Sequence, residues 1–71
     1  MTKKLLERLR GMYPIGTRIR LLKMDDDQAP PYGTLGTIQN IDDMGTVHVS
    51  WDTGSSLGLV YGIDKFETVV N

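Results

Sequence analysis

The stretch GTVHVSWDTGSS, residues 45–56, alternates apolar and polar side chains and has a glycine-containing turn at each end. Val47, Val49 and Trp51 share one face of an extended chain, and polar residues occupy the other face. A second short β-like segment, Gly36-Thr37-Ile38, precedes it across the first of these turns. Short alternating strands with glycines at the joints are typical of a small, strongly bent antiparallel barrel.

Together with the rest of the chain, this pattern predicts an all-β fold, a small five-stranded SH3-like barrel with a short N-terminal helix. The strands are expected at residues 17–22, 35–41, 46–51, 56–60 and 66–70. Pro30-Pro31 makes residues 24–33 a long loop, because proline is excluded from a central strand. Gly36 indicates a bulge or a sharp bend within its strand. The predicted core is Ile19, Leu21, Ile38, Ile41, Val47, Val49, Leu57, Leu59, Phe66 and Val69.

Residues 1–12 are expected to form the helix and residues 13–71 the barrel. The apolar residues Leu5, Leu6, Leu9 and Met12 recur with helical spacing and form one stripe. Thr2 is the predicted N-cap, and Gly11 is the predicted end. A helix this short is not stable alone in water. It must dock either on its own barrel or on a second copy of the chain, which leaves a homodimer through the helix open.

Composition limits the classes of function. The chain has no cysteine and one histidine among its 71 residues, so a disulfide, a thiolate metal site or a structural zinc site is not expected. No cofactor is expected, and no apolar run reaches the roughly 18 residues of a membrane span. We therefore expect a single cytoplasmic domain without a membrane partner.

The net charge of −1 conceals a split along the chain. Residues 1–24 carry seven basic side chains and one acidic one, whereas residues 25–71 carry one basic and eight acidic. Such a split can mark a surface for nucleic acid or for an acidic partner. The simpler interpretation, which we favour, is that the two parts pair with each other, within the fold or in a dimer.

The sequence also resembles a known family. The residues that carry the likeness are Tyr13-Pro14, Gly16-Thr17-Arg18-Ile19-Arg20-Leu21, Ala29-Pro30-Pro31, Gly33-Thr34, Gly36-Thr37-Ile38, Val47-His48-Val49, Trp51-Asp52, Gly54-Ser55-Ser56-Leu57-Gly58-Leu59, Asp64 and Phe66. They resemble a domain-of-unknown-function family of small bacterial and phage proteins. A smaller set of residues consists of Gly16, Arg18-Ile19, Gly36-Thr37-Ile38, Val47, Val49, Trp51-Asp52, Gly54 and Gly62. In these the chain more weakly resembles the substrate-binding domain of the mind-bomb type of eukaryotic ubiquitin ligase, which implies an SH3-like barrel that binds peptides.

Catalytic interpretations are weaker. The string Asp52-Thr53-Gly54-Ser55-Ser56 occurs in pepsin-like proteases, which need two carboxylates sharing a proton. One such string is present, and Asp and Gly are common turn residues. His48 is expected to be exposed and solvated, without a nucleophile in reach. The aspartates at 25–27 and 42–43 lack the spacing of a calcium loop, so no metal ligands are assigned.

We expect a non-enzymatic module that binds a protein or peptide through Tyr32, Trp51, Asp52 and Tyr61. Exposed aromatic rings of this kind dominate many interfaces. The alternative for Trp51 is a place in the core. The alternative function is nucleic-acid binding by the basic helix and first strand, through Arg18, Arg20 and Lys23.

Overall fold

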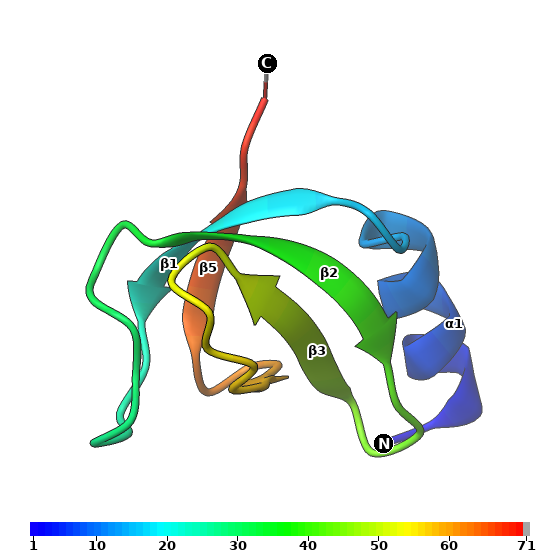
Figure 1. Cartoon of the computed structure of the whole chain (residues 1–71). Coiled ribbons are helices and arrows are strands. Elements are labelled where there is room, and N and C mark those ends of the chain that lie inside the picture. Colours follow the sequence, from blue (N-terminus) through cyan, green and yellow to red (C-terminus); the bar gives the residue numbers. More distant parts are fainter. Residues whose placement is uncertain (71) are drawn as a thin grey trace.

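One helix precedes five strands in the computed structural model, which describes residues 1–70 (Figure 1). The elements are α1 (Lys3–Met12), β1 (Arg18–Lys23), β2 (Leu35–Ile41), β3 (Thr46–Trp51), β4 (Leu59–Val60) and β5 (Lys65–Thr68). The strands form one antiparallel sheet in the order β4-β3-β2-β1-β5. The predicted β-rich fold of five strands and a short N-terminal helix is confirmed.

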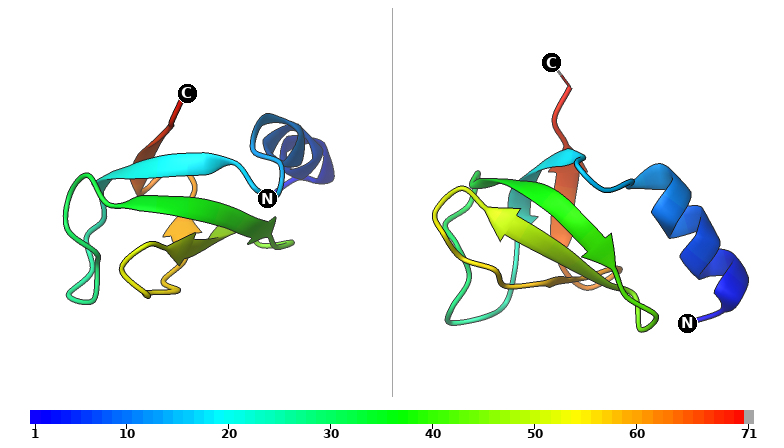
Figure 2. Two further views of the ribbon diagram at one scale, coloured as in Figure 1. Left: turned by 45° about the horizontal axis from the view of Figure 1, so that its top comes forward. Right: turned by 45° about the vertical axis from the view of Figure 1, so that its right-hand side comes forward.

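The sheet is rolled, because its two edge strands are neighbours along the chain. β4 and β5 lie at opposite ends of the strand order, yet only residues 61–64 connect them. In a flat sheet the edge strands would lie about 19 Å apart, since neighbouring strands are spaced by about 4.8 Å. The connection is a single tight turn, in which the N–H groups of Ile63 and Asp64 both donate to the Val60 carbonyl. The two edges therefore approach each other in a barrel-like form, and Figure 2 shows the curvature from two further sides.

A bulge in β2 brings two isoleucines, three residues apart, into the same core. Ile38 pairs with Val49 and Asn40 pairs with His48, so Gln39 is the extra residue. In a regular strand, residues 38 and 41 would point to opposite faces. The extra residue reverses the alternation, and both Ile38 and Ile41 are buried.

Gly36 is not the site of this bulge, so the first of the two alternatives predicted for this glycine, a bulge or a sharp bend, is wrong. It lies opposite Trp51 in the ladder between β2 and β3. A Cβ atom at Gly36 would lie only 2.6 Å from Val49 Cγ1 and 2.7 Å from Trp51 Cε3. Glycine is therefore required here because the indole ring packs against the backbone of β2.

The core joins one face of the sheet to the helix. Seven of the ten predicted core residues are buried, and Leu57, Phe66 and Val69 are half-buried instead. These three lie before β4, in the edge strand β5 and after β5, where fewer neighbours cover them. The observed core is Leu6, Leu9, Ile19, Leu21, Ile38, Ile41, Val47, Val49, Trp51 and Leu59.

Helix α1 docks on its own barrel. Thr2 caps it as predicted, because the Thr2 hydroxyl accepts a hydrogen bond from the Leu5 N–H at 3.1 Å. Leu6 and Leu9 enter the core, and the Arg10 guanidinium donates to the Ile41 carbonyl at 2.8 and 3.1 Å. The helix ends at Met12, the last residue of the predicted helix, and Gly11 lies within it instead of ending it.

The other strand boundaries shift by one to three residues. The fourth strand begins at Leu59 rather than at residue 56, and the last strand is Lys65–Thr68 rather than residues 66–70. The first strand is Arg18–Lys23 rather than residues 17–22. The segment before β4 bonds to Trp51 instead of forming a ladder, since the Trp51 indole N–H donates to the Leu57 carbonyl at 2.8 Å.

Candidate binding site

Three aromatic side chains gather between the residue that follows α1 and the last strand. The ring of Tyr13 lies 5.1 Å from that of Phe66 and 6.5 Å from that of Tyr61, measured between centroids, and both pairs are tilted. Such tilted contacts are favourable between aromatic rings. The three half-buried rings line a cavity of about 210 Å³, here called the aromatic groove, together with Gly62, Asp64 and Lys65.

Local structure fixes the walls of the aromatic groove. Tyr13 directly follows α1, and its N–H donates to the Leu9 carbonyl at 2.9 Å. On the other side, the Asp64 carboxylate accepts a hydrogen bond from the Val60 N–H at 2.8 Å. Gly62 has a φ of 90°, a left-handed conformation that suits glycine, and this closes the turn that carries Tyr61. The groove is therefore built from chain segments far apart in sequence.

The groove adjoins an open sheet edge. Among residues 1–70, β5 pairs only with β1, and the Val69 N–H donates to the Arg18 carbonyl. Because antiparallel hydrogen-bonded pairs alternate, the next such pair is Arg20 with Glu67. The backbone N–H and C=O groups of Phe66 and Thr68 consequently point away from β1. We call these outward groups the β5 edge, and no hydrogen bond occupies them within residues 1–70.

The four residues expected to form one binding surface do not meet in one place. Tyr61 lines the aromatic groove, whereas Tyr32 lines a separate cavity of about 210 Å³ with Leu21, Leu22, Lys23, Met24 and Pro30. Tyr32 is 77% exposed and Trp51 only 2%. Trp51 therefore takes the alternative role in the core, because it continues the buried face of Val47 and Val49.

Asp52 is engaged by an arginine from β1. The Arg18 guanidinium donates to both carboxylate oxygens of Asp52, at 2.9 and 2.7 Å. This bidentate hydrogen bonding holds the pKa of Asp52 below its ordinary value and raises the pKa of Arg18. A carboxylate held ionised in this way is unlike the shared-proton pair of an aspartic protease.

The basic face of the first strand is largely neutralised. Besides the Arg18–Asp52 pair, Arg20 contacts Glu67 at 2.9 Å. On the helix, Arg10 contacts Asp43 at 3.1 Å. Each of these pairs joins the basic first third of the chain to the acidic remainder, as the charge split indicated. Of the three residues of the nucleic-acid alternative, Lys23 alone has no carboxylate partner within residues 1–70.

His48 has a partner that the sequence did not reveal. Its Nε2 lies 2.9 Å from Asp42 Oδ2, while the other oxygen of Asp42 accepts from the Met44 and Thr46 N–H groups. These contacts, first of all the hydrogen bond to His48, lower the pKa of Asp42. The carboxylate holds the turn between β2 and β3, so the pair has a structural role.

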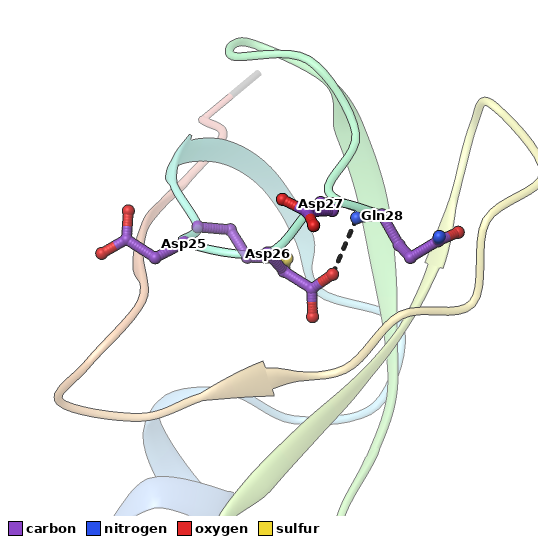
Figure 3. A pocket seen from close by; sticks show the side chains of 5 residues that line it. Asp25, Asp26, Asp27 and Gln28 are labelled. Carbon is purple, nitrogen blue, oxygen red and sulfur yellow. Dashed lines mark hydrogen bonds between the residues drawn. The ribbon is translucent and has the colours of Figure 1, made fainter.

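The aspartates of the long loop do not converge. Figure 3 shows the carboxylates of Asp25, Asp26 and Asp27 pointing in different directions, with Asp26 accepting from the Gln28 N–H at 2.7 Å. Across residues 1–70, no three His, Cys, Asp or Glu side chains are grouped to hold a metal ion. Within the same residues, no helix is long and apolar enough to cross a membrane.

Together, the rolled antiparallel sheet and the docked helix define a small barrel-like β domain. The chain belongs to the family described as Domain of unknown function (DUF4314), whose model matches residues 2–69. This confirms the resemblance to a domain-of-unknown-function family. No curated protein and no solved structure matches the chain.

Proposed function

We propose that this chain is a protein- or peptide-binding module, and that its partner binds at the aromatic groove and the β5 edge. The observation that carries the proposal is their adjacency, because Phe66 belongs to both. A groove supplies a site for one side chain, and an open edge supplies hydrogen bonds for an extended backbone. The two features together suit a short extended segment.

The pleat of β5 supports this mode of binding. Phe66 lies opposite Leu21 in the sheet, so its side chain shares the inner face with that buried residue. In an added strand, the residue opposite Phe66 points to the same face. Its side chain would therefore enter beside Phe66, between the rings of Tyr13 and Tyr61, and an apolar or aromatic residue fits these walls best.

The proposal also includes an SH3-like type of barrel and a cytoplasmic location in a bacterium or its phage. An SH3-like barrel is supported by β1 pairing with both β2 and β5 and by the long loop between β1 and β2. The mind-bomb likeness points in the same direction, toward peptide binding. A cytoplasmic setting suits a chain without cysteine, and the family likeness favours a bacterial or phage source.

Nucleic-acid binding through the first strand has less support. Arg18 and Arg20 already bind carboxylates, and phosphate binding there would have to displace Asp52 and Glu67. The electrostatic gain that drives binding to nucleic acid is thereby reduced. We therefore keep the aromatic groove as the proposed site.

The test is a selection from a random peptide library, followed by binding measurements on the selected peptides. Tyr61→Ala should weaken binding at least about tenfold if Tyr61 is a hot spot. Tyr32→Ala removes an exposed ring from the other cavity and should leave the affinity unchanged. Retained Trp51 fluorescence establishes that each variant is folded. Equal peptide affinity of the Tyr61 variant and the parent protein would refute the site. So would NMR shifts of backbone amides that change on peptide addition outside the segment from Gly62 to Thr68.

A further inference from the structure

The charged side chains of β5 follow one another in a particular order. Lys65 and Glu67 lie on one face of the strand, and Phe66 lies on the other. Lys65 stands opposite Lys23 of β1 in the sheet, and neither lysine has a carboxylate partner within residues 1–70. Two like charges opposite each other are unfavourable. The outer face therefore offers a place for a carboxylate beside Lys65.

The order of these charges specifies what would pair with the edge. In an antiparallel partner strand centred on Phe66, the residue opposite Glu67 should be basic and the residue opposite Lys65 acidic. From its N-terminal side, the partner strand should therefore have a basic residue, an apolar residue and an acidic residue in succession. This chain contains that pattern in Lys65-Phe66-Glu67 itself.

We propose that a second copy of this chain pairs with the first through the β5 edge, antiparallel and centred on Phe66, and forms a homodimer. The two Phe66 residues then exchange backbone hydrogen bonds across the two-fold axis. Lys65 of each copy faces Glu67 of the other copy, whose carboxylate it shares with Arg20 of that copy, the residue that contacts Glu67 within one chain. These two pairs are of the non-hydrogen-bonded kind, in which side chains approach most closely.

Charge also selects this pairing over the other registers. An antiparallel pairing centred on Glu67 would place two glutamates opposite each other. A parallel pairing in register would place lysine beside lysine and glutamate beside glutamate. Lysine on an edge normally discourages strand addition. Here the glutamate two residues further on the same face removes that obstacle for one arrangement, the two-fold antiparallel one.

The dimer differs from one formed through the helix. Leu6 and Leu9 of α1 are already buried in their own barrel, and Arg10 is bonded to Ile41. The inference uses the same edge as the proposed function but does not require a foreign peptide. A peptide and the second copy would compete for the edge, so peptide affinity should fall as protein concentration rises.

Sedimentation velocity over a range of protein concentrations tests the proposal. The parent protein should dimerise, and Lys65→Glu should weaken the dimer roughly tenfold or more, because two symmetric attractions become repulsions. The double variant Lys65→Glu with Glu67→Lys exchanges the charges across the interface but also removes the Arg20–Glu67 ion pair, so its Trp51 fluorescence is compared with that of the parent protein first. The folded double variant should dimerise again. Lys4→Glu makes the same change of charge on the exposed helix and should leave the dimer intact.

A second pair of variants tests the backbone. Thr68→Pro removes an outward N–H that the β1–β5 ladder does not use, so the domain should fold but stay monomeric. Thr68→Val keeps the N–H and should dimerise.

A folded parent protein that is monomeric at millimolar concentration would overturn the proposal, and so would a dimer insensitive to both Lys65→Glu and Thr68→Pro. A monomer that still binds selected peptides would leave the proposed function standing. A charge-dependent dimer that binds no peptide would support the homodimer and refute the proposed peptide binding.

Discussion

Gly36→Ala is expected to destabilise the domain, although alanine is ordinarily preferred over glycine in a strand. The added methyl carbon would lie 2.6 Å from Val49 Cγ1 and 2.7 Å from Trp51 Cε3. Both side chains are buried, so neither can move into solvent. Overpacking of this kind costs about 1–3 kcal/mol, whereas removing glycine from a strand gains about 0.5–1 kcal/mol. Two contacts under 3.0 Å to buried side chains place the cost in the upper part of that range, about 2–3 kcal/mol, so the expected net loss in the free energy of unfolding is about 1–2.5 kcal/mol.

Gly11→Ala is the matched control, because it makes the same chemical change in open space. Nothing lies within 4 Å of a Cβ at Gly11, which is within α1. This variant should gain about 0.5 kcal/mol from helix propensity. Urea denaturation followed by Trp51 fluorescence measures both values. For a domain of this size, the Gly36 variant should melt about 5–15 °C lower than the parent protein. A Gly36 variant as stable as the parent would refute the close packing of the indole ring on β2.

Three further outcomes follow from other contacts. The pKa of Asp42 is lowered by folding, so its stabilising effect is present above its ordinary value of 3.8 and is lost as pH falls below it. Asp42→Asn keeps an acceptor for the turn but does not titrate, so acid unfolding curves should be shallower than those of the parent protein. Arg10→Ala removes the hydrogen bonds to the Ile41 carbonyl and should cost about 1 kcal/mol in chemical denaturation. Arg8→Ala, at an exposed position of the same helix with no hydrogen bond to the barrel within residues 1–70, should cost almost nothing. Val47→Asp places a charge at a fully buried position and should abolish the cooperative melting transition; an unchanged melting temperature would mean that the register of β3 is wrong.

The sequence was informative where local rules decide the structure. The alternation in β3 placed Val47 and Val49 in the core, and the same alternation indicated the burial of Trp51. The turns at Gly45 and Gly54 have φ values of 85° and 95°, which glycine adopts without strain. A period of two residues and a preference for glycine are properties of the chain itself, so the sequence expresses them directly.

Tertiary packing decides the features that sequence reasoning missed. No local pattern shows that Gly36 must make room for an indole ring from the next strand, nor that the bulge falls at Gln39. The one available signal was the spacing of Ile38 and Ile41, because two core residues three apart in a strand require an irregularity between them. The aromatic groove likewise joins Tyr13 and Phe66 across most of the chain.

The ion pairs between the basic first third of the chain and the acidic remainder contribute more to the specificity of the fold than to its stability. Exposed pairs are worth little on their own because water screens them. Yet each one fixes a different alignment, since Arg10–Asp43 sets the helix on the β2–β3 turn and Arg20–Glu67 sets the register of β5. Only ten apolar residues among residues 1–70 form the buried core, so few contacts separate wrong alignments from the right one. Once these pairs form, Lys65 is left beside Lys23 on the outer face of the sheet without a carboxylate in residues 1–70. The alignment that the ion pairs impose is thus the same one that presents a lysine and a glutamate at the open edge.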